Sequence, residues 1–340
     1  MKSLYKLLLI MILFLAGSTM AQFNAETNKT GTTAAQFLKF GVGSRAIGMG
    51  GAFTATADDI TALYWNPAGS SRIYGREAIF NHVDWLLDLT YDYAGFVMDV
   101  SGVGTIGAFV SVLSMGEEKV RTVDQPEGTG ELFDAGALSI GVSFSRNLTD
   151  NFSIGFNAKY IREHYWNEAA TGVALDVGTL YTIPVLNETR LGASISNFGS
   201  KMRLDGRDIL EIYTVGSGQG NLVNTKYELE EYELPLLFRF GVAVDAIKSS
   251  TSRVTLALDA IHPNDNTEYL NTGLEYGWNE NIFLRAGYKS LFEQNGEQGF
   301  TVGLGVNYRL LQMVALKIDY AYQDFGRLEN VQYLSVGVKF

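Results

Sequence analysis

The sequence has no cysteine and only three histidines, His82, His164 and His262. Without cysteine, disulfides, thiolate metal sites and thiol chemistry are excluded. The histidines lie far apart and none belongs to an H-x-x-x-H pattern, so the sequence predicts no zinc site. Their spacing does not single out a serine–histidine pair either. We therefore expect no catalytic site, no cofactor and no bound metal.

The chain also lacks a basic patch and a long apolar run. Beyond the N-terminus, no stretch approaches the roughly 20 apolar residues that a membrane-spanning helix needs. The formal net charge is -11, and no stripe of Lys and Arg stands out, which argues against a nucleic-acid partner. Prolines number only five, against 18 tyrosines, 20 phenylalanines and 37 glycines. This balance favours strands over helices.

The N-terminal residues have the pattern of a secretory signal peptide. Lys2 and Lys6 precede a short apolar run, residues 7–16, and the segment ends small-x-small at residues 19–21. A charged start, a short apolar core and such an end are typical of export signals. A buried N-terminal helix is the weaker alternative. We predict that Gln22 begins the mature chain.

From about residue 77 onward, apolar and polar residues alternate. In residues 300–310, for example, every even-numbered position is apolar. This period of two is typical of strands with one apolar and one polar face. Continued along the chain, it predicts fourteen strands, at 77–88, 90–100, 104–114, 132–148, 151–163, 170–183, 189–199, 232–247, 252–262, 267–278, 281–290, 298–311, 312–323 and 330–340.

The links between these strands alternate in length. Short links lie at 148–151, 184–188, 248–251 and 279–280, and long polar links lie at 115–131, 200–231 and 291–297. Tight periplasmic turns and longer extracellular loops are typical of transmembrane β-barrels. An even number of strands would place both ends of the barrel in the periplasm. We therefore predict an all-β fold, a transmembrane antiparallel β-barrel of about 14 strands with a small N-terminal plug.

A soluble β-sandwich and a β-solenoid are the alternatives. A sandwich should carry many Lys and Glu on its polar face, whereas this face is mostly small, with sparse charges of both signs. These charges, which we expect to line a lumen, are Lys159, Asp176, Arg239, Asp245, Asp259, Arg285, Lys317 and Asp319. A solenoid needs a repeat of about 20–50 residues, and none is found. The chain stops on Phe340, and an aromatic end is common in outer-membrane barrels.

Aromatic residues lie toward the predicted strand ends and fit interfacial girdles. They are Tyr160, Tyr181, Tyr276, Trp278, Tyr288, Tyr308, Tyr320 and Tyr322. The two longest loops are acidic and are our candidates for binding a partner, because loops often carry function. The residues concerned are Glu117, Glu118, Asp124, Glu127, Asp205, Asp208, Glu228 and Glu230. They form no D-x-D-x-D-G ladder for calcium, so a solvated acidic face is the simpler interpretation.

Residues 48–69, GMGGAFTATADDITALYWNPAG, differ from the rest of the chain in being rich in small residues. Asp58 or Asp59 could cap a short helix at 60–65 by accepting backbone N–H bonds. Pro67 would end that helix, because a residue before proline avoids helical geometry. A backbone folded in a narrow space benefits from glycine. A plug inside the lumen is our interpretation; a periplasmic cap or linker is the alternative.

The same region carries a family resemblance. Residues 37–53, FLKFGVGSRAIGMGGAF, then Ala57-Asp58-Asp59 and Trp65-Asn66-Pro67-Ala68-Gly69, resemble the opening of the PorV/PorQ family of outer-membrane barrels from Bacteroidetes-type bacteria. That family is similar to the FadL long-chain fatty-acid transporters, in which the Asn-Pro-Ala stretch belongs to a hatch that plugs a fourteen-stranded barrel. The resemblance implies a hatch motif of Asp58, Asp59, Asn66, Pro67, Ala68 and Gly69.

We predict three parts: a signal peptide at 1–21, a hatch at 22–76 and an outer-membrane barrel at 77–340. The resemblance implies a part in the type IX secretion system, where family members bind secreted proteins by a C-terminal signal domain. Expected partners are outer-membrane lipid, the secretion translocon, attachment-complex subunits and cargo proteins. The alternative is a FadL-like channel for long-chain fatty acids or other hydrophobic small molecules, which the small, polar lumen residues disfavour. A barrel enzyme is much less favoured.

Overall fold

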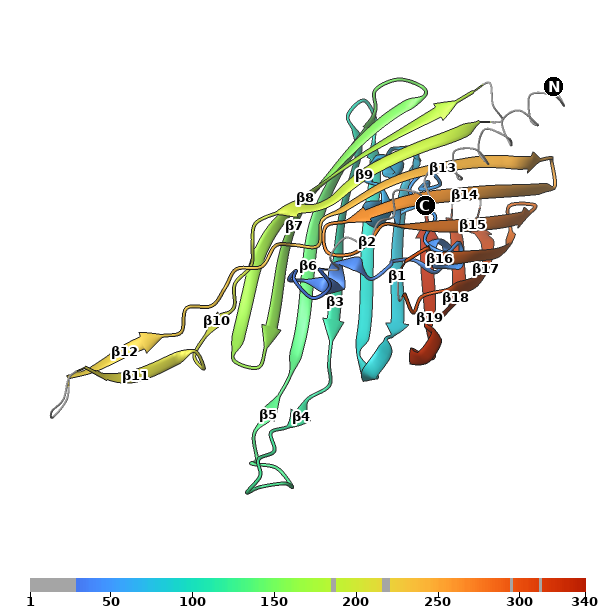
Figure 1. Cartoon of the computed structure of the whole chain (residues 1–340). Helices are drawn as coiled ribbons and strands as arrows, with labels where there is room; N and C mark the ends of the chain where they lie inside the picture. The colour runs from blue at the N-terminus through green and yellow to red at the C-terminus, as the bar shows by residue number, and fades with distance from the viewer. Residues whose placement is uncertain (1–28, 185–187, 216–220, 294–295, 312–313) are drawn as a thin grey trace.

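The computed structural model describes residues 29–184, 188–215, 221–293, 296–311 and 314–340. The predicted signal peptide, residues 1–21, lies outside these ranges. Within them, one antiparallel sheet contains 15 strands. The two-residue β10 (Asp205–Gly206) pairs only with the end of β8, and the other strands close into a fourteen-stranded barrel (Figure 1). The predicted fold class is therefore confirmed.

The barrel strands follow one another around the ring in chain order. Each pairs with its sequence neighbours, and β1 pairs with β19 to close the ring. The strands are β1 (Arg76–Asp84), β2 (Thr90–Val100), β3 (Gly104–Ser114), β6 (Ala135–Asn147), β7 (Phe152–Tyr165), β8 (Glu168–Ile183), β9 (Thr189–Gly199), β13 (Leu237–Lys248), β14 (Ser252–Pro263), β15 (Tyr269–Trp278), β16 (Ile282–Leu291), β17 (Phe300–Leu311), β18 (Val314–Asp324) and β19 (Asn330–Lys339).

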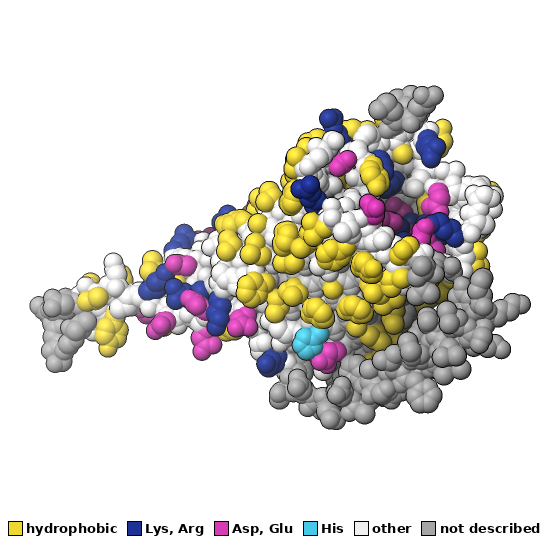
Figure 2. All heavy atoms as spheres, turned by 90° about the horizontal axis from the view of Figure 1, so that it is seen from above, with side chains coloured by type: hydrophobic (Ala, Val, Ile, Leu, Met, Phe, Trp, Pro, Cys, Tyr) yellow, Lys and Arg dark blue, Asp and Glu magenta, His cyan; other side chains and the backbone are white. Residues whose placement is uncertain are grey.

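The alternation in sequence becomes an apolar outside and a polar inside. On β17, Val302 and Leu304 are exposed on the outer surface, while Thr301, directly before Val302, is fully buried. Hydrophobic side chains accordingly cover much of the outer surface (Figure 2). Of the predicted girdle residues, Tyr181 and Trp278 are exposed near the ends of β8 and β15. An apolar belt of this kind is the surface that a lipid bilayer covers.

The two rims of the barrel differ. One carries the short turns and both ends of the ring, where the Arg76 N–H donates to the Phe340 carbonyl (2.8 Å). The other carries the long connections, including the hairpin of β4 (Glu118–Lys119) with β5 (Leu132–Phe133) and that of β11 (Leu210–Val215) with β12 (Asn221–Lys226). In barrels of this type the short turns are periplasmic, so the long-loop rim is extracellular.

The helices of the described residues are short, and none is long and apolar enough to cross a membrane. They are η1 (Gln36–Lys39), α2 (Ser44–Gly48), α3 (Ala62–Trp65), η2 (Pro67–Arg72), η3 (Leu86–Asp88) and η4 (Gly326–Leu328). The first four belong to residues 33–73, which we call the hatch. Figure 1 draws them in blue inside the ring of strands.

Several predicted bounds differ from the structure. The loop predicted at 200–231 contains β10, β11 and β12, and it runs on to residue 236. The strand predicted from residue 232 begins at Leu237, just after Pro235, which has no N–H to donate to a sheet. The first strand ends at Asp84 rather than residue 88, because Leu87 adopts a left-handed φ of 60° in η3.

Candidate functional site

The hatch fills the space that the strands enclose. Its apolar side chains form the main buried cluster of the molecule with inward residues of the wall. Those with no measurable exposure are Val42, Ala46, Ile47, Met49, Ala52, Phe53, Ala55, Ala57, Ala62, Leu63 and Ala68. The interior is therefore a packed core and not an open pore.

Glycines in the wall let the hatch backbone come unusually close. A Cβ placed on Gly178 would lie 2.1 Å from Asn66 Oδ1, and one on Gly192 would lie 2.3 Å from the Thr54 carbonyl oxygen. Atoms cannot approach that closely, so only glycine fits these wall positions. The glycines of the strands and the small residues of the hatch thus serve the same close contact.

The two adjacent acids of the hatch motif have different roles. Asp59 Oδ1 accepts the Thr61 N–H (2.9 Å) just ahead of α3, and its other oxygen accepts from Arg45 (2.9 Å). Asp58 is more exposed and pairs only with Arg45 (2.5 Å) among the contacts of its side chain. The N-cap residue of α3 is Thr61, whose side chain makes no cap hydrogen bond, so neither acid caps this helix as predicted. The helix is shorter than predicted, beginning at Ala62 instead of residue 60.

The Asn-Pro-Ala-Gly part of the motif joins the hatch to the wall. The Asn66 amide nitrogen donates to the Thr54 carbonyl (2.8 Å) in the hatch and to the Thr179 carbonyl (3.0 Å) in β8. Asn66 has extended geometry and ends α3 as predicted, but Pro67 then begins a second helix, η2. Ala68 is fully buried. A Cβ on Gly69 would lie 2.3 Å from a carbonyl oxygen of the hatch itself, so glycine is required there too.

A buried cluster of charges fastens the hatch to β14, β15 and β16. Glu275 has a fully buried side chain and accepts hydrogen bonds from Arg45 of the hatch (2.8 Å) and from two wall residues, Arg253 (3.0 Å) and Arg285 (2.7 Å). Three guanidinium groups around one carboxylate make Glu275 the centre of this network. A buried carboxylate is tolerated only when its charge is paired in this way.

Wall side chains also bind the hatch backbone directly. One oxygen of the fully buried Asp259 accepts the N–H groups of Phe53 (2.9 Å) and Thr54 (2.8 Å). On the opposite side, the Asn157 amide donates to the Leu63 carbonyl (2.7 Å). Polar residues of the lumen thus form hydrogen bonds with backbone groups of the hatch, a segment that has little regular structure of its own.

The charges predicted to line the lumen do point inward, and most meet a partner of opposite sign. Lys159 pairs with Asp176 (2.7 Å) and Arg285 with Asp319 (2.6 Å). Asp245 pairs with Arg190 (2.7 Å). These partners stand on adjacent strands or, for Arg285 and Asp319, on strands separated by β17, and not across the barrel, because the hatch occupies the space between opposite walls.

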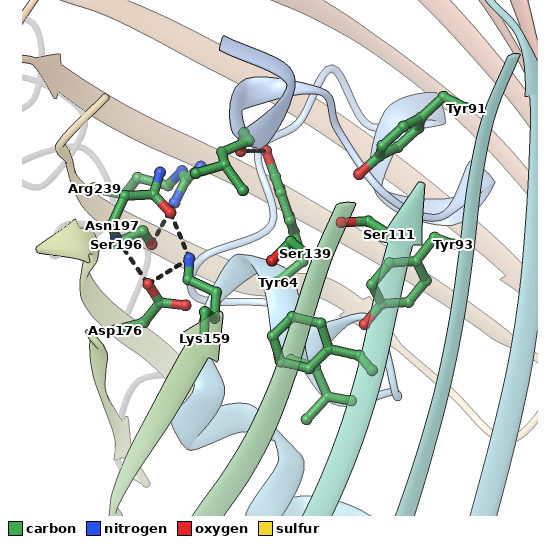
Figure 3. Close-up of a pocket in the computed structure, with 13 residues that line it drawn as sticks. Tyr64, Tyr91, Tyr93, Ser111, Ser139, Lys159, Asp176, Ser196, Asn197 and Arg239 are labelled. Atoms are coloured by element: carbon green, nitrogen blue, oxygen red, sulfur yellow. Dashed lines mark hydrogen bonds and ion pairs between the residues drawn. The ribbon is translucent and has the colours of Figure 1, made fainter. Parts of the chain in front are cut away.

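A small cavity remains between the hatch and the wall, toward the long-loop rim. Figure 3 shows the Lys159 ammonium between Asp176 and Asn197, with Tyr64 of the hatch and Tyr93 of β2 nearby. The cavity measures about 20 Å³. About 10–15 Å³ is enough for one water molecule, so this space suits a water or two and not a fatty acid. The Tyr93 hydroxyl, which lines this cavity, is buried without a partner in the described residues.

A larger groove lies on the outer surface over β6 to β9. It measures about 600 Å³ and is mainly apolar. Beside it the pairing of β8 with β9 shifts register at Asn197, whose φ is 67°. The outward side chains that line the groove are Ile140, Val142, Ala158, Tyr160, Val173, Leu175 and Phe198. The groove belongs to the belt that faces lipid.

The longest connection projects far from the barrel as an arm, residues 200–236 (Figures 1 and 2). Near the barrel its side chains form exposed ion pairs, such as Arg203 with Glu231 (3.8 Å). Farther out, the β11–β12 hairpin exposes apolar side chains, including Leu210 (58%), Ile212 (64%) and Leu222 (69%). These apolar residues were not among the predicted binding residues, because the loop is marked in the sequence by its acids.

The acidic residues predicted as partner-binding candidates lie on two separate projections. Lys226 donates a hydrogen bond that lowers the pKa of Asp205, and Asp208 accepts from Asn167 (2.8 Å). The others are exposed to solvent: Glu117, Glu118, Asp124, Glu127, Glu228 and Glu230. No group of three or more potential metal ligands forms in the described residues.

Comparisons with known proteins agree with this geometry. A family model described as type IX secretion system protein PorV matches residues 23–262. No curated protein sequence matches the chain. Among solved structures, the CymD monoaromatic hydrocarbon channel is similar with a TM-score of 0.56 and 12% identity, over 88% of this chain and 98% of the channel.

Two further structures resemble the fold. The toluene transporter TodX of Pseudomonas putida has a TM-score of 0.54 and 14% identity, over 88% of this chain and 97% of TodX. A FadL homologue of Pseudomonas aeruginosa has a TM-score of 0.52 and 11% identity, over 88% and 98% of the two chains. At such identities the likeness concerns the fold alone. Because the family match spans well over half of the sequence, this chain belongs to the PorV family of type IX secretion system proteins and is an outer-membrane β-barrel.

Proposed function

We propose that this barrel serves type IX secretion by binding secreted proteins, or partner subunits of the secretion machinery, at the cell surface. The arm is the proposed binding site, and the hatch keeps the barrel closed. The role needs no catalytic group. Membership of the PorV family supports the secretion context.

The contrast between the filled interior of the barrel and the exposed hairpin of the arm carries the proposal. Inside, two cavities beside the hatch measure about 20 Å³ each, too small for a transported molecule. Outside, an isolated two-stranded hairpin bearing Leu210, Ile212 and Leu222 stands in solvent. Two-stranded hairpins are at best marginally stable in water, and exposed apolar patches mark interaction sites. The surface that lacks a partner is therefore the arm.

Deletion of the hairpin tests this function. A variant lacking residues 210–226 should assemble as a barrel and migrate differently on gels when unheated, since the removed strands pair only with each other. In crosslinking pull-downs from intact cells it should recover much less cargo or translocon. The matched control removes residues 118–133 from the other long loop, whose β4 and β5 also pair only with each other. Undiminished recovery by the first variant would contradict the role of the arm.

A FadL-like channel for hydrophobic small molecules is the second candidate. Two of the similar structures are described as a hydrocarbon channel and a toluene transporter, and the apolar outer groove next to the bent β9 would suit such a molecule. Transport would require the hatch to leave its wall contacts. Uptake of a labelled fatty acid that is lost on deletion of the gene, while secretion stays intact, would favour this candidate over the first.

A further inference from the structure

The hatch begins at the extracellular rim. Thr33 forms a parallel β-bridge with Glu233, and the Ala34 N–H donates to the Glu233 carbonyl (2.9 Å). Glu233 belongs to the root of the arm, where the chain returns from β12 to β13. The chain therefore enters the hatch beside the arm.

A buried carboxylate clamps the next residues to the same rim. Asp265 lies in the connection between β14 and β15 and is almost fully buried. Its Oδ2 accepts from Thr33 Oγ1 (2.8 Å), Gln36 Nε2 (2.9 Å) and Lys39 Nζ (2.7 Å). We call residues Thr33–Lys39 the strap. Three donors from a single short segment on one oxygen hold the strap in a defined place.

Other residues near this rim contact the same region. The Ala35 N–H donates to the Glu163 carboxylate (3.0 Å) near the end of β7. Phe40, directly after the strap, stacks on Trp85 between β1 and β2 (4.0 Å between ring centroids). Trp85 in turn packs against Phe325, which precedes η4 (5.5 Å). Contacts from around the ring thus place the start of the hatch at the long-loop rim.

The end of the hatch lies at the opposite rim. Ser71 donates to Asn147 (2.6 Å) at the end of β6, and Arg72 donates to Thr182 (2.5 Å) near the end of β8. Both strands end at the short turns. The hatch therefore crosses the lumen from the extracellular to the periplasmic rim.

We infer that residues Lys29–Thr32, which precede the strap and are exposed, are presented at the cell surface beside the root of the arm. We further assign them to the surface that a bound secreted protein covers; this second part rests on the function proposed above. The partner would then contact the arm and the N-terminal segment together. The strap makes this a fixed neighbourhood, because Glu233 belongs to the arm and bonds the strap directly.

Cysteine labelling tests the topology, because the natural chain has no cysteine. A Lys29→Cys variant should react on intact cells with a maleimide too large to pass the outer membrane. Val123→Cys, in the fully exposed tip of a long loop, should react equally, and Asp150→Cys, in a short turn, should react only after the membrane is opened. If Lys29→Cys instead follows the pattern of Asp150→Cys, the inference is overturned.

Protection by cargo tests the shared surface. Saturation with purified cargo should reduce labelling of Lys29→Cys and of Asn224→Cys on the arm several-fold, and should leave Val123→Cys unchanged. Protection of the arm position without any protection of Lys29→Cys would overturn the shared surface. Protection of neither position, with surface labelling of Lys29→Cys intact, would overturn the proposed binding function while the topology stands.

Discussion

The hatch and the arm use polar and apolar side chains in opposite ways. In the hatch, apolar residues are buried, and charged wall residues such as Glu275 and Asp259 are paired with hatch groups. In the arm, apolar residues such as Ile212 stand in solvent, and the charges form exposed pairs that contribute little to stability. The apolar side chains of the hatch are therefore covered within this chain, whereas those of the described part of the arm are not.

Crowding the hatch should produce the largest effect. A Cβ on Gly155 of β7 would lie 2.3 Å from the Pro67 backbone, so a Gly155→Leu variant cannot hold the hatch in place. We expect most of the protein to fail to reach the folded, heat-modifiable form in outer-membrane fractions. Gly116→Leu is the control, because no atom lies within 4 Å of the corresponding Cβ. Equal assembly of both variants would show that the hatch is not fixed against the wall.

Removal of the central charge should weaken the hatch without crowding it. Glu275→Gln removes the buried carboxylate that Arg45, Arg253 and Arg285 share and takes one negative charge from the network, although each arginine keeps a second acidic partner. Breaking a buried charge network costs up to about 3–5 kcal/mol. Unfolding in detergent by heat or denaturant measures the loss. The control is Glu280→Gln, whose exposed carboxylate binds only Arg253 and should contribute about 0–1 kcal/mol. Similar losses for both would mean that the buried network does not hold the structure.

The barrel strands could be predicted from the sequence, whereas the hairpin of the arm could not. All fourteen strands were predictable because one side of each faces lipid and the other faces the hatch, so that the period of two is imposed everywhere. The β11–β12 hairpin has water on both sides, and nothing imposes alternation on Leu210–Val215. Its acidic surroundings then made it look like an ordinary polar loop.

The sequence predicted that the hatch is packed inside the barrel, but not which residues hold it there. Small residues and paired acids indicated a packed segment, but they could not distinguish Asp59 from Asp58, which differ by one position and share Arg45. The contacts that matter most join distant parts of the chain: Lys39 and Asp265 are 226 residues apart, and Arg45 and Glu275 are 230 apart. No local pattern reports such a pair.

Trimming the arm should change binding and leave stability alone. Ile212→Ala and Leu222→Ala remove exposed apolar side chains, so the barrel should unfold as before. If these residues contact the partner, each should weaken cargo binding about tenfold, which corresponds to about 1.4 kcal/mol. Asn224→Ala, directly opposite Ile212 in the hairpin, is the control and should matter less. Binding constants measured with purified cargo test this expectation. If the variants lost stability and kept their affinity for cargo, the arm would pack against its own barrel instead.

Acid should loosen the strap, and this is the smallest effect expected. Burial alone would raise the pKa of Asp265, but the hydrogen bonds from Lys39 and Gln36 outweigh it and hold that pKa below its ordinary value of about 4. The stabilisation is therefore present above that value and is lost as the pH falls below it. As the pH falls, hydrogen exchange at the Ala34 amide of the unaltered protein should therefore rise, when it is compared with that of Asp265→Asn at each pH. Glu163 also faces the strap, so a Glu163→Gln background separates its titration; a response that persists in Asp265→Asn would exclude Asp265 as the group responsible.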